Sequence, residues 1–339
     1  MFVVPRKPAL TCLRKSDFVE YRTLGNSGLV VSAVGLGCNN LGRPRTPTET
    51  QEGTNEVIRA AVDAGITLFD LADIYGARPG LSEERFAEAY RQFGNDEMVI
   101  VSKFGLPSHD THEGRGSRRY LTKALERSLT RLGRDHIDLY FYHSPDGITP
   151  AEETLQALDD AVRSGKVRYI GTSNHAGWQI ADADHIARRD RLTPYIATES
   201  HYNLLDRRAE LEVIPAAQRF NLGVLPYFPL ANGLLTGKYR HGKAPDGSRI
   251  AHSKQDLLES TDWEQIERFI AFAEARDLTP LEVAFSWLAS RPQVSSVIAG
   301  ATTAEQVVQN AKAVSWVPTA EDEAELDAIF PPPEPIALF

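Results

Sequence analysis

The sequence predicts one α/β domain, a (β/α)8 TIM barrel with an N-terminal β-hairpin, a long loop after strand seven and an extra C-terminal helix. Eight short runs of apolar, β-branched residues recur along the chain, and a helical stretch follows each of them. The runs are apolar on both faces, as parallel strands covered by helices should be. We therefore expect a barrel domain at 21–330, between a flexible N-terminal tail (1–20) and a Pro-rich C-terminal tail (331–339).

The expected strands and helices alternate along the chain after an N-terminal hairpin. Residues 21–24 and 29–32 flank a turn-forming cluster of Gly, Asn and Ser, and they predict a hairpin that plugs one end of the barrel. The strands are expected at 32–37, 67–70, 98–104, 137–143, 167–173, 195–202, 223–229 and 294–300. The helices are expected at 48–64, 82–93, 118–132, 150–164, 176–190, 207–220, 262–290 and 303–314, with the extra helix near 319–329.

Local helix signals agree with several of these boundaries. Thr48 before Glu49 predicts the start of the first helix, and Gly65 its end. Pro150 and Gly165 bound the fourth helix in the same way. The connection 230–261 is rich in Gly, Lys and Ser, and a loop of that length on a barrel predicts a lid or part of a binding site.

Composition excludes several classes of protein. The 339 residues are 42% hydrophobic and 24% charged, and the net charge of −9 argues against nucleic-acid binding. No run of about 18 apolar residues is present, so no membrane span is expected. Cys12 and Cys38 form no disulfide framework and no metal-binding pattern, which favours a reducing cytoplasm and no metal. Prolines and four charges in the first twenty residues break up any signal-peptide core. Oligomeric state is not predicted.

Polar residues stand at the ends of three successive predicted strands. Asp70 ends the second strand, with Tyr75 five residues later; Lys103 ends the third strand and His143 the fourth. The carboxyl ends of parallel strands meet at one place, where α/β folds carry out chemistry. Taken singly, these residues also fit a structural ion pair and a core histidine. Because buried ion pairs add little net stability, their grouping favours a functional site. Asp73 competes with Asp70, but we expect it to lie in the loop, in solvent.

These residue types are suited to carbonyl chemistry. A free tyrosine is a poor acid at neutral pH, and an adjacent ammonium is expected to lower its pKa toward the working range. Asp70 is the natural counter-ion that keeps Lys103 charged, and His143 is suited to donating a hydrogen bond to a carbonyl oxygen. No side chain supplies a hydride, so a nicotinamide must.

Two other chemistries are disfavoured. Gly35, Gly37 and Gly42 suggest a dinucleotide fingerprint, but the last glycine stands two positions late and nearby prolines prevent the helix that the fingerprint needs. A lyase or aldolase would use Lys103 as a Schiff-base nucleophile. That role requires a neutral lysine, and the Asp70 carboxylate raises the lysine pKa instead.

The chain resembles the aldo-keto reductase family, bacterial-type NAD(P)H-dependent members in particular, over about residues 21–315. The matching segments occur in order at 68–76, 101–105, 142–146, 170–174, 225–230 and 233–239. The resemblance implies reversible reduction of small aldehydes or ketones, with a catalytic tetrad of Asp70, Tyr75, Lys103 and His143 in which Tyr75 is the acid. A cofactor-binding regulatory subunit with little turnover, like the channel-associated β-subunits that resemble this family, remains the alternative.

The resemblance also implies a cofactor site. Ser173 and Asn174 would bind the nicotinamide carboxamide, and Tyr227 would stack on the ring, although by spacing alone it could be a core aromatic. Further cofactor-binding positions are Glu199, Phe228, Leu230, Gly300, Thr302, Gln306 and Asn310. Asn39, Asn40 and Trp178 are expected to line the substrate pocket; Trp178 fits a helix-packing role equally well.

Two positions and one segment depart from the family pattern. Leu71 stands where Thr or Ser is usual, and Glu199 where many members carry Gln. A charged Glu199 accepts hydrogen bonds but donates none, so it is expected to pair with a neighbouring Arg or Lys or to weaken cofactor orientation. Residues 300–310 contain no Lys or Arg for a 2′-phosphate. The resemblance favours NADPH, and NADH remains possible.

Overall fold

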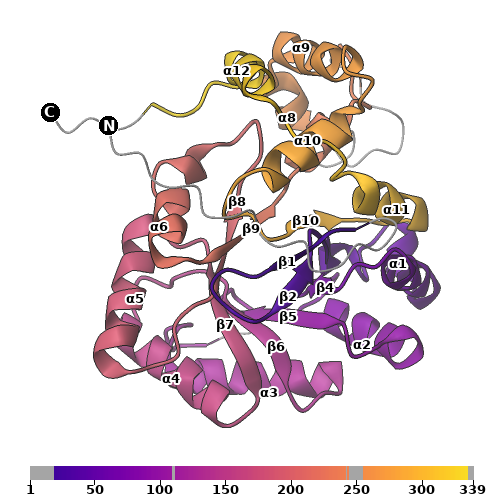
Figure 1. Ribbon diagram of the computed structural model, residues 1–339. Helices are drawn as coiled ribbons and strands as arrows, with labels where there is room; N and C mark the ends of the chain where they lie inside the picture. Colours follow the sequence, from indigo (N-terminus) through magenta and orange to yellow (C-terminus); the bar gives the residue numbers. More distant parts are fainter. Residues whose placement is uncertain (1–18, 109–110, 242, 244–254, 335–339) are drawn as a thin grey trace, which may run out of the picture.

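The computed structural model describes residues 19–108, 111–241, 243 and 255–334, and it contains the predicted barrel (Figure 1). The strands are β3 (Val34–Gly37), β4 (Leu68–Asp70), β5 (Val99–Phe104), β6 (Ile137–Tyr142), β7 (Val167–Ser173), β8 (Ala197–His201), β9 (Gly223–Tyr227) and β10 (Val297–Gly300). They are all parallel and lie in the order β10-β3-β4-β5-β6-β7-β8-β9. Val224 of β9 pairs with Val294 just before β10, which brings the two ends of the sheet together. The predicted (β/α)8 fold is confirmed.

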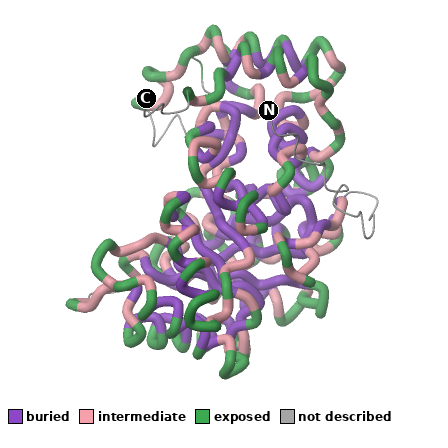
Figure 2. The backbone as a smooth tube through the Cα atoms, turned by 60° about the vertical axis from the view of Figure 1, so that its left-hand side comes forward, coloured by how far each residue is buried: buried purple, intermediate pink, exposed green. Residues whose placement is uncertain are grey.

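Helices surround the strands (Figure 1), and most of them alternate buried and exposed residues, as Figure 2 shows, whereas α10 is buried on all sides over residues 283–289. They are α1 (Gln51–Asp63), α2 (Leu81–Phe93), α3 (Arg118–Leu132), α4 (Ala151–Arg163), α5 (Gly177–Asp190), α6 (Val213–Phe220), α8 (Gln255–Ser260), α9 (Trp263–Glu274), α10 (Pro280–Ala289), α11 (Ala304–Lys312) and the extra helix α12 (Ala320–Ile329). Short 3-10 turns are η1 (Cys38–Asn40), η2 (Pro47–Glu49), η3 (Arg208–Glu210) and η4 (Ala231–Thr236). Within the described residues, no helix has the length and apolar character that crossing a bilayer requires.

The predicted helix at 262–290 is wrong, because the chain breaks there into α9 and α10. Asp277 has a left-handed φ of 54°. Thr279 then caps α10 by accepting from the Glu282 N–H, and the Glu282 side chain accepts from the Thr279 N–H. Pro280 fills the first helical position and disfavours helix in the residue before it.

Two predicted helix starts are also wrong. The first helix is capped by Thr50, whose side chain accepts from the Gly53 N–H, and Thr48 lies instead in the preceding turn η2. The predicted helix 207–220 begins only at Val213, because η3 occupies its first residues. The ends of both helices agree with the prediction within one or two residues.

The N-terminal hairpin, β1 (Tyr21–Thr23) and β2 (Val30–Ser32), closes the amino end of the barrel. Leu24 and Val31 belong to the same apolar cluster as Phe141 and Leu225, which line the barrel interior. At the turn, Gly25 has a φ of 56°, and a Cβ there would lie 2.4 Å from the Ile196 carbonyl oxygen. The predicted plug is confirmed, and the carboxyl end is left for the site.

Two predictions remain as they were. Residues 244–254, in the middle of the long connection 230–261, lie outside the described residues, so its role as a lid stays a prediction. Most of the predicted N-terminal tail and residues 335–339 also lie outside them, so the division into a barrel and two tails stays a prediction.

A buried polar cluster lies between the barrel and helices α2 and α3. Contrary to the expected solvent exposure, Asp73 is only 1% exposed, because its N–H donates to the Lys103 carbonyl and extends the β4–β5 pairing beyond the strand end. Glu83 accepts from Ser102 Oγ and from Arg131 Nε, each at 2.6 Å. Within the described residues, neither Asp73 carboxyl oxygen makes a hydrogen bond of ordinary geometry. Burial raises the pKa of Asp73 to about 7, aided by Glu83 and opposed by Ser108 and Arg131.

We predict that Asp73→Asn becomes more stabilising as pH rises. The unfolded chain loses the Asp73 proton near pH 4 and the folded protein near pH 7, so the wild type loses folding free energy across that interval. The gain in free energy of unfolding should therefore be about 2–3 kcal/mol larger at pH 8 than at pH 5. Urea unfolding at the two pH values measures it, with the exposed Asp96→Asn as control. An equal gain at both pH values would mean that Asp73 is already ionised at pH 5 in the folded protein.

Candidate functional site

A buried lysine joins three of the predicted tetrad residues. Lys103 is fully buried on β5, and its Nζ forms an ion pair with Asp70 Oδ1 at the end of β4. Nζ also lies 3.2 Å from the Tyr75 hydroxyl. A third neighbour lies outside the predicted tetrad: Glu199 Oε2 on β8 is 3.3 Å from the same Nζ. The cation that Glu199 was expected to find is therefore Lys103.

The departure at Leu71 does not disturb this cluster. Lys103 Nζ donates to the Leu71 main-chain carbonyl at 3.0 Å, a contact that any side chain at position 71 permits. The Leu71 side chain is fully buried in the apolar layer outside the strands.

The electrostatics keep Lys103 charged and Tyr75 neutral. Burial alone would lower the pKa of Lys103, but Asp70, Glu199 and Tyr75 together hold it well above its usual value. Burial raises the pKa of Tyr75, and Lys103 opposes that effect without overcoming it. The expected net lowering of the Tyr75 pKa is thus wrong for this structure. The phenol holds its proton, which is the form that a proton donor requires.

His143 follows β6 and is held beside Tyr75. The two ring centroids are 5.9 Å apart and the rings meet edge to face. Burial, together with Lys103, lowers the pKa of His143 to about 3, so the imidazole is neutral at physiological pH. Its Nδ1 is buried without a hydrogen-bond partner among the described residues. A neutral imidazole has one N–H to donate to a carbonyl oxygen.

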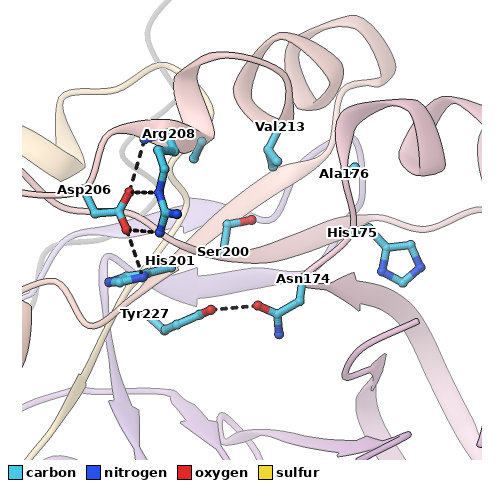
Figure 3. Close-up of a pocket in the computed structure, with 10 residues that line it drawn as sticks. Asn174, His175, Ala176, Ser200, His201, Asp206, Arg208, Val213 and Tyr227 are labelled. Atoms are coloured by element: carbon cyan, nitrogen blue, oxygen red, sulfur yellow. Dashed lines mark hydrogen bonds and ion pairs between the residues drawn. The ribbon is translucent and has the colours of Figure 1, made fainter. Parts of the chain in front are cut away.

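Asn174 connects His143 to the predicted stacking residue, Tyr227. Its backbone is left-handed, with a φ of 56°. Its Nδ2 donates to the His143 carbonyl at 2.9 Å and to Ser173 Oγ at 3.0 Å. Its Oδ1 accepts from the Tyr227 hydroxyl at 2.7 Å, as Figure 3 shows. One amide thereby fixes residues from the ends of β6, β7 and β9.

One face of the Tyr227 ring packs against a residue that sequence reasoning missed. His201 stacks on it with centroids 5.4 Å apart and an angle of 13° between the planes. His201 Nδ1 in turn lies 3.2 Å from Asp206 Oδ2, which also binds Arg208 (Figure 3). The missed signal was spacing: His201 is two residues after Glu199 on β8, and alternate residues of a strand face the same side.

These residues border an open pocket of about 320 Å³ at the ends of β7, β8 and β9 (Figure 3). Asn174 and Tyr227 are shared with the site just described, whereas Asp70, Tyr75, Lys103 and His143 do not line the pocket. The pocket therefore lies beside the lysine cluster and not over it.

The residues expected at the adenosine end lie around the start of α11. Thr303 caps this helix, and Gln306 Oε1 accepts from the N–H of Thr302 at 2.8 Å. Asn310 is buried one turn further along α11. Gly300 permits a close approach, because a Cβ there would lie 2.7 Å from Asn40 Nδ2 and 3.2 Å from Asn39 Oδ1.

The three predicted substrate-pocket residues come from two elements, the turn η1 after β3 and the helix α5 after β7. Asn39 and Asn40 lie against Gly300, next to the segment expected to hold the cofactor. Trp178 is in the first turn of α5 and is 65% exposed. Phe228 meets Tyr227 edge to face at 5.3 Å, and Leu230 is half-buried at the start of η4. Among the described residues, no group of three or more His, Cys, Asp or Glu side chains is arranged to hold a metal ion.

Arg43 is a second residue that sequence reasoning missed. It follows η1 in the first βα loop, is half-buried, and donates from Nη1 to Asn40 Oδ1 at 2.7 Å. Because Asn40 lies against Gly300, a guanidinium stands close to the segment that contains no Lys or Arg of its own. Only the fold brings these two segments together, through the β10–β3 pairing.

Known proteins of similar sequence cover almost the whole chain. Uncharacterized oxidoreductase YrpG of Bacillus subtilis (strain 168) is 37% identical over 93% of this chain and 97% of its own. L-glyceraldehyde 3-phosphate reductase of Escherichia coli (strain K12) is 34% identical over 88% of each chain. A putative voltage-gated potassium channel subunit beta of Schizosaccharomyces pombe is 35% identical over 88% of this chain and 89% of its own.

A sequence model of one family matches residues 33–330, from the first barrel strand through α12. That span includes every strand of the barrel and every residue of the site described above. This chain is therefore an oxidoreductase that belongs to the aldo/keto reductase family.

Proposed function

We propose that this protein reduces aldehydes or ketones to alcohols with a nicotinamide cofactor, and that Tyr75 donates the proton. The observation that carries the proposal is the buried Lys103 ammonium, which touches both the Asp70 carboxylate and the Tyr75 hydroxyl at the carboxyl end of the barrel. A neutral phenol next to a fixed positive charge is a proton donor whose developing negative charge is already stabilised.

Each tetrad residue has a separate task in this proposal. Asp70 keeps Lys103 charged inside the protein, and Lys103 stabilises the phenolate that forms as Tyr75 releases its proton. His143, neutral and fixed by packing, donates a hydrogen bond to the carbonyl oxygen and directs it toward Tyr75. The carbonyl oxygen thus receives a proton and becomes the hydroxyl of the alcohol.

The residues present fit a nicotinamide. Tyr227 offers an aromatic ring that is held by His201 on one side and by its hydrogen bond to Asn174. Ser173, Asn174 and Glu199 supply a hydroxyl, an amide and a carboxyl group for a carboxamide, and Phe228 and Leu230 border the same strand end. When bound, the cofactor supplies the hydride to the carbonyl carbon. Gly300, Thr302, Gln306 and Asn310 would hold its adenosine end.

We propose NADPH as the preferred cofactor, with Arg43 as the cation for its 2′-phosphate. The guanidinium lies beside Asn40 and Gly300, and no ion pair involves it among the described residues. Thr302 and Thr303 add hydroxyl groups at the same place. A guanidinium bound to a phosphate is among the stronger charge-assisted contacts.

Small aldehydes are the proposed substrates. The relative from Escherichia coli is named for reduction of an aldehyde, which supports this class. Trp178 offers exposed aromatic surface in the first turn of α5, after the end of β7, and we propose that it contacts the organic part of the substrate together with Asn39 and Asn40 after β3.

A cofactor-binding regulatory subunit is the second candidate function. Relatives named as potassium channel subunits beta match at a similar level of identity. The complete set of Asp70, Tyr75, Lys103 and His143, brought together by the fold, favours turnover.

We predict that Tyr75→Phe lowers kcat for an activated aromatic aldehyde by at least about a thousandfold, because the variant has no proton to donate. NADPH oxidation at 340 nm measures the rate, and cofactor fluorescence measures binding, which should be retained. Tyr169→Phe, at a half-buried position on β7 away from Lys103, is the matched control and should keep its rate. Comparable rates for wild type and Tyr75→Phe would remove Tyr75 from the mechanism. A wild type that binds NADPH and oxidises none across a carbonyl panel would favour the regulatory subunit.

We predict that Arg43→Met raises KM for NADPH about tenfold and KM for NADH less than twofold, because only NADPH has the 2′-phosphate. The exposed Arg91→Met on α2 controls for the loss of one positive charge. If both KM values rise equally, Arg43 stabilises the first βα loop and does not distinguish NADPH from NADH. If neither changes, the 2′-phosphate is bound elsewhere.

A further inference from the structure

Lys103 is surrounded by more acceptors than it has protons. An ammonium has three N–H groups, whereas four oxygens lie within reach of Nζ: those of Asp70, Leu71, Tyr75 and Glu199. Asp70 makes the closest contact and Glu199 the longest, at 3.3 Å. Glu199 Oε2 also makes no hydrogen bond of ordinary geometry among the described residues. Of the four acceptors, Glu199 therefore has the weakest interaction with the Lys103 ammonium.

The net charge of the cluster also favours a protonated Glu199. With Lys103 charged and both carboxyl groups ionised, a nearly water-free site would carry one uncompensated negative charge, which costs several kcal/mol. Glu199 is 2% exposed and is ion-paired with no cation but Lys103 among the described residues. A proton on Glu199 removes the excess charge, while the closer Asp70–Lys103 pair stays intact. Consistent with this, burial and Asp70 raise the pKa of Glu199 to about 8, against the effect of Lys103.

Ionisation of Glu199 would act directly on the proton donor. A Glu199 carboxylate competes with Tyr75 for the Lys103 ammonium and adds a negative charge that further raises the pKa of Tyr75. A phenolate would then be harder to form at the moment of proton transfer. A neutral Glu199 acid leaves the ammonium to Asp70 and Tyr75, and its O–H is a hydrogen-bond donor.

We propose that Glu199 is a positioning residue that works as a neutral acid, and that its ionisation withdraws Lys103 from Tyr75 and switches off carbonyl reduction at alkaline pH. This inference rests on the proposed function. The ionisable groups that interact with Glu199 from the elements around it are Asp70 on β4, Tyr75 in the following loop, Lys103 on β5 and Tyr227 on β9. Two further ionisable groups interact with Lys103, namely Cys38 after β3 and His143 after β6.

These other groups do not give the same pH dependence. Cys38 and Tyr227 have pKa values raised above their ordinary ones, and His143 is already neutral. Tyr75 and Lys103 also have raised pKa values, so they titrate at higher pH than Glu199. Burial also raises the pKa of Asp70, but its closer contact with Lys103 favours the ionised form of Asp70 over that of Glu199. Loss of turnover beginning near pH 8 therefore points to Glu199.

The test compares the pH dependence of kcat in wild type and Glu199→Gln, which has nearly the same shape but does not ionise. Wild-type kcat should fall tenfold per pH unit above about 8, and this fall should be absent in Glu199→Gln. Normalised to pH 7, the variant should exceed wild type about 30-fold at pH 9.5. Glu199→Asp retains a carboxyl group and should retain an alkaline fall. The exposed Glu126→Gln on α3 is the matched control and should follow wild type.

A second measurement needs no turnover. Protein labelled with [δ-13C]glutamate and titrated by NMR should show one carboxyl carbon with a midpoint near pH 8, and Glu199→Gln should lack it. Superimposed pH profiles in active enzymes would overturn the role of Glu199 and leave the proposed reduction intact. Titration of all glutamate carbons below pH 6 would overturn the neutral acid in the same way. A wild type without turnover would overturn the proposed function, and the carbon titration alone would then decide the protonation of Glu199.

Discussion

The buried charge of Lys103 is the constraint on which the site depends. An ammonium without water costs several kcal/mol unless fixed partners surround it. Here the partners come from β4, from the loop after β4 and from β8 across the barrel. Those elements occupy fixed heights because the strands pair in one register around a closed sheet. Closure of the barrel thus holds the ion cluster together, and the cluster in turn makes a different register costly.

A second set of contacts ties the proposed cofactor side to this cluster. Asn174 joins His143, Ser173 and Tyr227 through one amide, and its left-handed backbone turns that amide back toward β6. Asn adopts this conformation more readily than most residues, because its short polar side chain bonds locally. The proton-donating half and the aromatic half of the site are therefore parts of one hydrogen-bonded frame.

Local patterns predicted the barrel and much of the site, because each strand is a short apolar run and Asp70, Lys103 and His143 terminate such runs. Contacts that depend on closure were not predictable in this way. Glu199 and Lys103 are far apart in sequence and meet only across the barrel, and Arg43 approaches Gly300 only because β10 pairs with β3. Asp73 was misplaced because main-chain pairing continues beyond β4. The break before α10 was available in the sequence, since Thr279, Pro280 and Glu282 form a capping box.

The acidity of Tyr75 is best understood as a property of the whole cluster. Burial alone makes the phenol a weaker acid, and Lys103 only partly offsets it. A raised pKa is no obstacle for a donor whose proton leaves only when a substrate oxygen is gaining negative charge, because the ammonium then stabilises the phenolate left behind. What matters is how much of the ammonium's field reaches Tyr75 at that moment. Every carboxylate that shares Lys103 reduces that field. The charge state of the neighbours of Lys103 therefore controls the proton donor more directly than any contact made by Tyr75 itself.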